Sequence, residues 1–175
     1  MRLRGWVYLL WEWRYEWLEL QNTKESSITL DGWSIELYRQ DELYFTIPLV
    51  GSIPANGYFL IGASDKIPDV DVNYKNLSGK LVNSGMKVVL KSNAEEIVDE
   101  VDAKEGWQAG ENASKRTMEK EKQAWHTSVS VGGTPRGQNS EGLKELVSNL
   151  SSFATKKDLN GSSWDSLNIL IGLLW

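Results

Sequence analysis

Apolar and polar residues alternate along several segments of this chain, with the period of two that a strand with one buried face requires. In segment 17–22, Leu18 and Leu20 alternate with Glu19 and Gln21. Three further segments place their apolar residues in the same way, at Trp33, Ile35 and Leu37, at Leu43, Phe45 and Ile47, and at Met86, Val88 and Leu90. Segment 58–61 is short and continuously apolar, which is typical of a central strand. These segments are predicted as strands that share one interior.

Turn-forming pairs separate the predicted strands, at Asp31-Gly32, Asn56-Gly57, Ser78-Gly79 and Ser84-Gly85. Glycine takes positive φ at little cost, and aspartate or asparagine side chains bond the backbone of a turn. Pro48 ends one strand because proline cannot donate to a central ladder. Strands are also expected over 97–101 and near 116–118. Short strands with frequent turns predict an all-β sandwich or barrel.

The pattern changes after Asn139. Apolar residues then follow the spacing of a helix, at Leu143, Leu146, Val147 and Leu150. Segment 148–163 is rich in serine and lysine and is interpreted as a linker, and a second short helix is predicted over 164–175. The chain is therefore divided into a β-sandwich over 1–139 and a linker with a short helical tail over 140–175.

Composition narrows the function classes. The 175 residues carry a net charge of −5 and contain no cysteine. Disulfides, thiol catalysis and cysteine-ligated zinc are excluded, and binding to nucleic acid is disfavoured because cationic side chains are not in surplus. No apolar run has the length of a transmembrane helix. A chain without cysteine is compatible with both the cytoplasm and the cell exterior.

Candidate catalytic and metal-binding residues do not form a complete motif. His126 is the only histidine, which excludes a site built on two histidines. Asp69, Asp71 and Asn73 have the spacing that opens an EF-hand loop, but Tyr74 and Lys80 occupy the positions of its glycine and closing glutamate. We expect no catalytic residues, no cofactor and no metal.

Two further motifs are interpreted as structural. The phrase from Gly132 to Pro135 lacks the lysine of a phosphate-binding loop and is predicted to be a tight closing turn, with Asn139 bonding its backbone. The basic residues Lys115, Arg116, Lys120 and Lys122 are interleaved with glutamates, which indicates a solvated face.

A set of short motifs occurs in order along the chain: Leu10-Trp11-Glu12-Trp13 as a first strand, Trp17 and Glu19 in the next strand, Gly32, Trp33, Gly57, Asp99, Arg116, Trp125, Gly133, Thr134, Pro135 and Asn139. Taken together, these motifs resemble the lamin-tail domain, over roughly residues 8 to 139. The resemblance implies an immunoglobulin-like β-sandwich of the prokaryotic type, in which Arg116 packs against a buried carboxylate such as Asp99. It also implies a non-enzymatic module that mediates protein interaction or surface tethering, in an exported or cell-surface setting.

Tryptophan is over-represented, with nine residues. Trp6, Trp11, Trp164 and Trp175 lie at or beyond the ends of the sandwich pattern and form a candidate surface for a protein partner or a neighbouring domain. Alternatively, the C-terminal helix folds back and covers Trp6 and Trp11. Two other functions stay open: an accessory fragment of an exported hydrolase or nuclease, and a sandwich that binds glycans by stacking tryptophans.

Overall fold

The computed structural model describes residues 15–121, 124–140 and 167–173. In chain order its strands are β1 (Glu16–Asn22), β2 (Ile28–Thr29), β3 (Ser34–Arg39), β4 (Glu42–Pro48), β5 (Ser52–Ile53), β6 (Tyr58–Gly62), β7 (Val72–Asn73), β8 (Lys87–Lys91), β9 (Ile97–Asp102), β10 (Arg116–Glu121), β11 (Ala124–Val131) and β12 (Leu167–Leu173). A single-turn 3-10 helix, Lys75–Leu77, follows β7.

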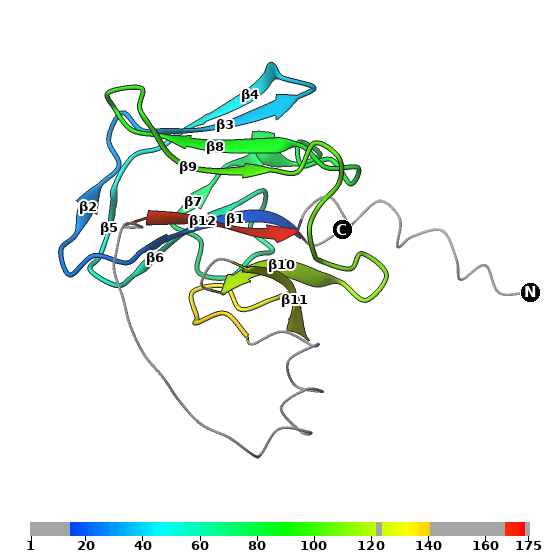
Figure 1. The fold of residues 1–175 in the computed structure, drawn as a ribbon. Helices are drawn as coiled ribbons and strands as arrows, with labels where there is room; N and C mark the ends of the chain where they lie inside the picture. Colours follow the sequence, from blue (N-terminus) through cyan, green and yellow to red (C-terminus); the bar gives the residue numbers. More distant parts are fainter. Residues whose placement is uncertain (1–14, 122–123, 141–166, 174–175) are drawn as a thin grey trace, which may run out of the picture.

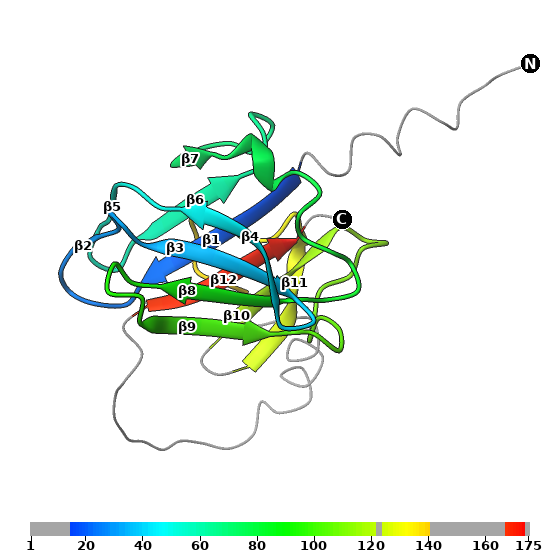
Figure 2. The same ribbon diagram turned by 90° about the horizontal axis from the view of Figure 1, so that it is seen from above.

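The strands form two facing layers (Figure 1). One is a sheet in the order β4-β3-β8-β9. The other contains the sheet β12-β1-β6-β7, and the hairpin β10–β11 lies beyond β12 in the same layer (Figure 2). The long pairings are antiparallel, whereas β6 and β7 pair in parallel. This arrangement confirms the predicted all-β class and is consistent with an immunoglobulin-like sandwich.

The core lies between the layers and is built from the alternating apolar positions. The central strands β1, β3 and β8 supply fully buried side chains to it, namely Leu18, Leu20, Ile35, Leu37, Val88 and Leu90. Burying a side chain of this size contributes about 1.5–3 kcal/mol, so these positions supply much of the driving force for folding. The predicted shared interior is therefore confirmed.

One predicted core position is wrong. Leu43 was expected beside Phe45 and Ile47, yet it is 55% exposed. The pairing of β3 with β4 shifts register between Leu37 and Tyr38, so that Leu37 stands opposite Phe45 while Tyr38 stands opposite Leu43. An extra residue in one strand reverses the faces of the side chains beyond it. The turn end of β4 consequently presents Leu43 to solvent.

The helix predicted over 164–175 is also wrong, because residues Leu167–Leu173 form strand β12 and pair with β1. A short apolar run is compatible with either structure, and its β-branched residues Ile169 and Ile171 favour a strand. The pairing with β1, a strand far away in the sequence, makes this segment a strand and not a helix. The predicted helix at 143–150, the linker 148–163 and the predicted first strand at 10–13 lie outside the described residues.

Strand β11 was not predicted. Its sequence from Ala124 to Val131 mixes apolar and polar residues without strict alternation, and its neighbour β10 was expected only near residues 116–118. Within the described residues, no helix has the length and apolarity to cross a membrane.

A pair of leucine substitutions tests the register shift. Leu37→Ala removes a fully buried side chain and should lower the free energy of unfolding by about 2–5 kcal/mol. Leu43→Ala, on the paired strand, removes an exposed side chain and should change it by no more than about 0.5 kcal/mol. Urea denaturation of both variants measures the difference, and equal losses would show that Leu43 belongs to the core.

Candidate functional site

The loop of residues 132–140 follows β11. It makes hydrogen bonds both to Glu19 of β1 and to Glu119 of β10. Its entry requires glycine: Gly132 and Gly133 have φ of 83° and 77°. A Cβ atom on Gly133 would lie 2.2 Å from Oγ1 of Thr117, so there is no room for a side chain. The Gly132 amide donates to the carbonyl of Lys115 (2.7 Å), the residue that precedes β10.

Beneath and beside this loop lies a group of hydrogen-bonded polar residues that we call the polar cluster; Glu19 and Glu119 are buried, whereas Asp71 and Arg136, at its edge, are exposed. Its members come from β1, the β6–β7 connection, β10 and the loop itself: Glu19, Asp71, Glu119, Thr134, Arg136, Asn139 and Ser140.

Glu19 is the member from β1, on the face opposite Leu18 and Leu20. Alternation predicted only that Glu19 points away from Leu18 and Leu20; in the structure it is 1% exposed because the loop covers it. The Arg136 backbone amide donates to Oε2 of Glu19 (2.6 Å). Burial raises the pKa of Glu19 to about 7, although this amide and the Arg136 charge act to lower it.

Glu119, on β10, holds both ends of the loop. Its Oε1 accepts from the Thr134 hydroxyl (2.8 Å), and its Oε2 accepts from the hydroxyl (2.7 Å) and the amide (3.0 Å) of Ser140. Asn139 adds a bond from its Nδ2 to the carbonyl of Lys120 (2.7 Å). A carboxylate with this many donors is well satisfied despite its burial, and it locks the loop onto β10.

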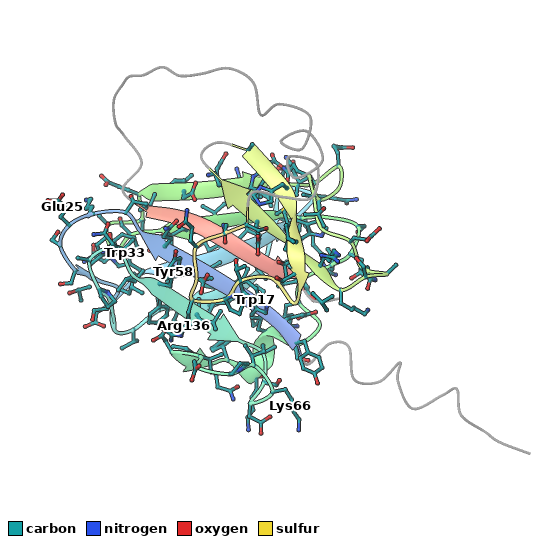
Figure 3. All side chains as sticks on the ribbon, turned by 90° about the horizontal axis from the view of Figure 1, so that it is seen from below. Trp17, Glu25, Trp33, Tyr58, Lys66 and Arg136 are labelled. Atoms are coloured by element: carbon teal, nitrogen blue, oxygen red, sulfur yellow. The ribbon has the colours of Figure 1, made fainter. Side chains whose placement is uncertain are left out.

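Arg136 connects the loop to the other side of the sheet. Its Nη2 lies 2.5 Å from Oδ2 of Asp71, and its Nε donates to the carbonyl of Asp69. The same Asp71 oxygen accepts the Leu60 amide of β6 (2.7 Å). Figure 3 shows Arg136 and Trp17 on the outer side of β1 and β6. Asp71, considered from the sequence as a calcium ligand, is thus bonded to an arginine and to the backbone.

His126 borders the polar cluster. It stands opposite Glu119 in the β10–β11 pairing, and its Nε2 lies 3.7 Å from Glu119 Oε2. This Nε2 is buried and makes no hydrogen bond within the described residues. Because the Ser140 hydroxyl donates to Glu119, its proton is not directed to a histidine base. Among the described residues, no group of three or more metal-ligating side chains is present.

A second buried carboxylate lies at the start of β1. Glu16 is 3% exposed and accepts the Gly79 amide at its Oε2 (2.8 Å). Burial raises its pKa to about 7, although hydrogen bonds from the backbone of residues 79–81 act to lower it.

The aromatic residues of the predicted motif occupy packing positions. Trp17 is 3% exposed and contacts Leu60 and Ile67. Trp33, Trp107 and Trp125 are half-buried against the main core. Among the tryptophans that the structure describes, none is exposed. The predicted partner surface, Trp6, Trp11, Trp164 and Trp175, lies outside the described residues.

The charged motif residues Asp99 and Arg116 make separate contacts. Lys120 Nζ is 3.9 Å from Oδ1 of Asp99 and 5.6 Å from the centre of the Trp125 ring. Arg116 donates from Nη1 to the carbonyl of Ser128 (3.2 Å). The proposed packing of Arg116 against Asp99 stays a prediction.

The remaining motif residues belong to turns. Gly32 has φ of 80°, and the Gly57 amide donates to the carbonyl of Pro54 (3.0 Å). Pro135 is half-buried between Thr134 and Arg136. The contacts of Glu119, Arg136 and Asp71 were not predicted, because they join segments far apart in the chain.

Comparison with protein families supplies one match. The family model described as Lamin Tail Domain matches residues 8–105. The matched region contains β1 to β9, and with them Glu19 and Asp71, whereas Glu119 and the loop of residues 132–140 follow it. A comparison with curated proteins found no match.

The raised pKa values predict that the protein loses stability as the pH rises. Glu16 and Glu19 favour their protonated forms in the folded state, so their contribution is complete below the unfolded pKa of 4.5 and is lost as the pH passes about 7. For each glutamate, the difference between the unfolded pKa of 4.5 and the folded pKa of about 7 corresponds to roughly 3 kcal/mol of the free energy of unfolding. Urea denaturation at pH 5 and pH 8 should therefore show a lower free energy of unfolding at pH 8.

Glu19→Gln tests whether Glu19 causes part of this loss of stability. Glutamine keeps an oxygen that accepts the Arg136 amide, but it has no carboxyl group to ionise. This variant should show a smaller loss between pH 5 and pH 8 than the unmodified chain. Asp41 contributes in the opposite sense and at lower pH, since its hydrogen bond from Lys104 lowers its pKa. An unchanged pH profile in Glu19→Gln would contradict the assignment.

Proposed function

This chain belongs to the lamin tail domain family, and we propose that it is a binding module that uses the loop of residues 132–140 and its surroundings to contact a protein partner. The family consists of immunoglobulin-like domains without catalytic activity. The proposal therefore concerns which surface of the sandwich a partner meets.

The proposal rests on the hydrogen bonds by which two buried carboxylates of the polar cluster hold the loop of residues 132–140. The carboxylate of Glu119 accepts from Thr134 and Ser140, and that of Glu19 accepts from Arg136. These groups hold the loop in one conformation. A loop fixed in this way presents a preorganised surface, and preorganisation lowers the entropic cost of binding.

We call the exposed residues of the loop and of the neighbouring β6–β7 connection the loop face. It combines the loop with the β6–β7 connection, which Arg136 joins through its contacts with Asp69 and Asp71. Its exposed residues are Asp65, Lys66, Pro68, Asp69, Asp71, Arg136 and Gln138. Both signs of charge are present, which suits a protein partner better than a nucleic-acid backbone.

A charge reversal on the loop face tests the proposal. Lys66→Glu should reduce binding of the partner about fivefold or more, as expected when an interface contact worth ~1 kcal/mol is lost. Lys24→Glu makes the same charge change beside Glu25, at the opposite end of β1 from Lys66 in Figure 3, and should leave binding unchanged. The partner is identified by cross-linking the tagged full chain in the cells that produce it, and affinities are then measured with purified partner.

Cross-links are expected on the loop face. Equal loss of affinity in both variants, or cross-links confined to the sheet β4-β3-β8-β9, would contradict this assignment.

A further inference from the structure

Strand β4 lies at the outer edge of its sheet (Figure 2), and its pairing with β3 contains one extra residue. Leu37 stands opposite Phe45 and Tyr38 stands opposite Leu43, so Tyr44 is the residue without a partner in the ladder. A bulge of this kind redirects a side chain from strict alternation. Tyr44 and Phe45 accordingly both pack, half-buried, against the core. The edge strand therefore presents two neighbouring rings at the rim of the core.

Two cationic side chains lie close to these rings. Arg39, at the end of β3, places its guanidinium carbon 3.7 Å from the centre of the Tyr44 ring. Lys80, which follows the 3-10 helix, places its Nζ 5.2 Å from the centre of the same ring and 5.0 Å from that of Phe45. The Phe45 ring also lies 6.0 Å from the ring of Tyr74. We call Arg39, Tyr44, Phe45, Tyr74 and Lys80 the rim cluster.

No carboxylate of the described residues neutralises the two cations of the rim cluster. Neither Arg39 nor Lys80 forms an ion pair with any of those residues. Glu42 stands opposite Arg39 in the strand register without such a pair, and Asp41 is bonded to Lys104 (2.6 Å). An aromatic ring attracts a cation through its quadrupole and leaves the net charge in place. The rim cluster consequently offers two positive charges to an anion.

The cations are also held in position. Glu16 accepts the Gly79 amide, and the backbone of Lys80 and Leu81 hydrogen-bonds the same carboxylate. This buried group anchors the backbone of the segment, while the Lys80 ammonium is directed to the rings of β4. Arg39 is held by its contact with Tyr44. Charges that are fixed before a ligand arrives lose little conformational freedom on binding.

The chemistry of the rim cluster suits an acidic segment of a protein. Carboxylates form strong charge-assisted hydrogen bonds with arginine and lysine, and the three half-buried rings offer apolar surface beside them. In an extended segment, side chains on one face recur about every 6.5 Å, so neighbouring acidic residues reach cations that surround one ring. A nucleic acid requires many more cations, and this chain has a net charge of −5.

We propose that the rim cluster is a binding site for an acidic segment of a partner protein, whose carboxylates contact Arg39 and Lys80. The rim cluster shares no residue with the loop face. This inference therefore goes beyond the proposed function and does not depend on it.

A peptide of alternating glutamate and leucine is the probe, and its counterpart with glutamine in place of glutamate is the control. The isotope-labelled full chain is titrated with each peptide, and amide shifts are followed by NMR. We expect the shifts to concentrate at the rim cluster and the neutral peptide to bind at least about tenfold more weakly. Arg39→Gln and Lys80→Gln should each raise the Kd of the acidic peptide about fivefold.

Two matched variants serve as controls. Lys24→Gln removes an exposed lysine outside the rim cluster, and Lys66→Glu changes the loop face, so both should leave the Kd of the acidic peptide unchanged. Urea denaturation of Arg39→Gln and Lys80→Gln should give closely similar midpoints to the unmodified chain, which separates lost binding from lost folding. Equal binding of the two peptides, an unchanged Kd in both rim variants, or no binding at millimolar peptide would overturn the inference. A weaker affinity of Lys66→Glu for the cross-linked partner bears on the loop face alone.

Discussion

The enclosure of β1 is the constraint on which the rest of the structure depends. Leu18 and Leu20 face the core, Glu19 lies under the loop of residues 132–140 on the opposite face, and the two edges pair with β6 and β12. A strand covered in this way must find a partner for every backbone polar group. Segments from the end of the chain therefore have to return to it, one as a covering loop and the other as a neighbouring strand.

The polar cluster shows how buried carboxylates act as structural anchors. Glu119 receives hydroxyl and amide donors, whereas Glu19 receives one amide and retains a raised pKa. A buried carboxylate that loses its donors is costly, so alternative loop conformations that break these bonds are disfavoured. The cluster consequently specifies where the loop lies, and with it the geometry of the loop face.

The alternation of apolar and polar residues predicted the strands whose formation depends only on their own sequence. Strand alternation located Leu18, Ile35 and Leu90 in one interior, because each requires only a period of two and a buried face. The exposure of Leu43 depends on a register shift between two strands, and the burial of Glu19 depends on a loop more than a hundred positions away. Residues 167–173 become a strand because β1 has an edge to fill, which a short apolar run does not reveal by itself.

Hydrogen exchange at the amides of β1 tests the enclosure most directly. Successive amides of a strand point to alternate edges, so those of Glu16–Asn22 report separately on β6 and on β12. The account predicts that both sets exchange only through global unfolding and rank among the slowest in the protein. Rapid exchange of the set directed toward β12, with protection of the set directed toward β6, would contradict it.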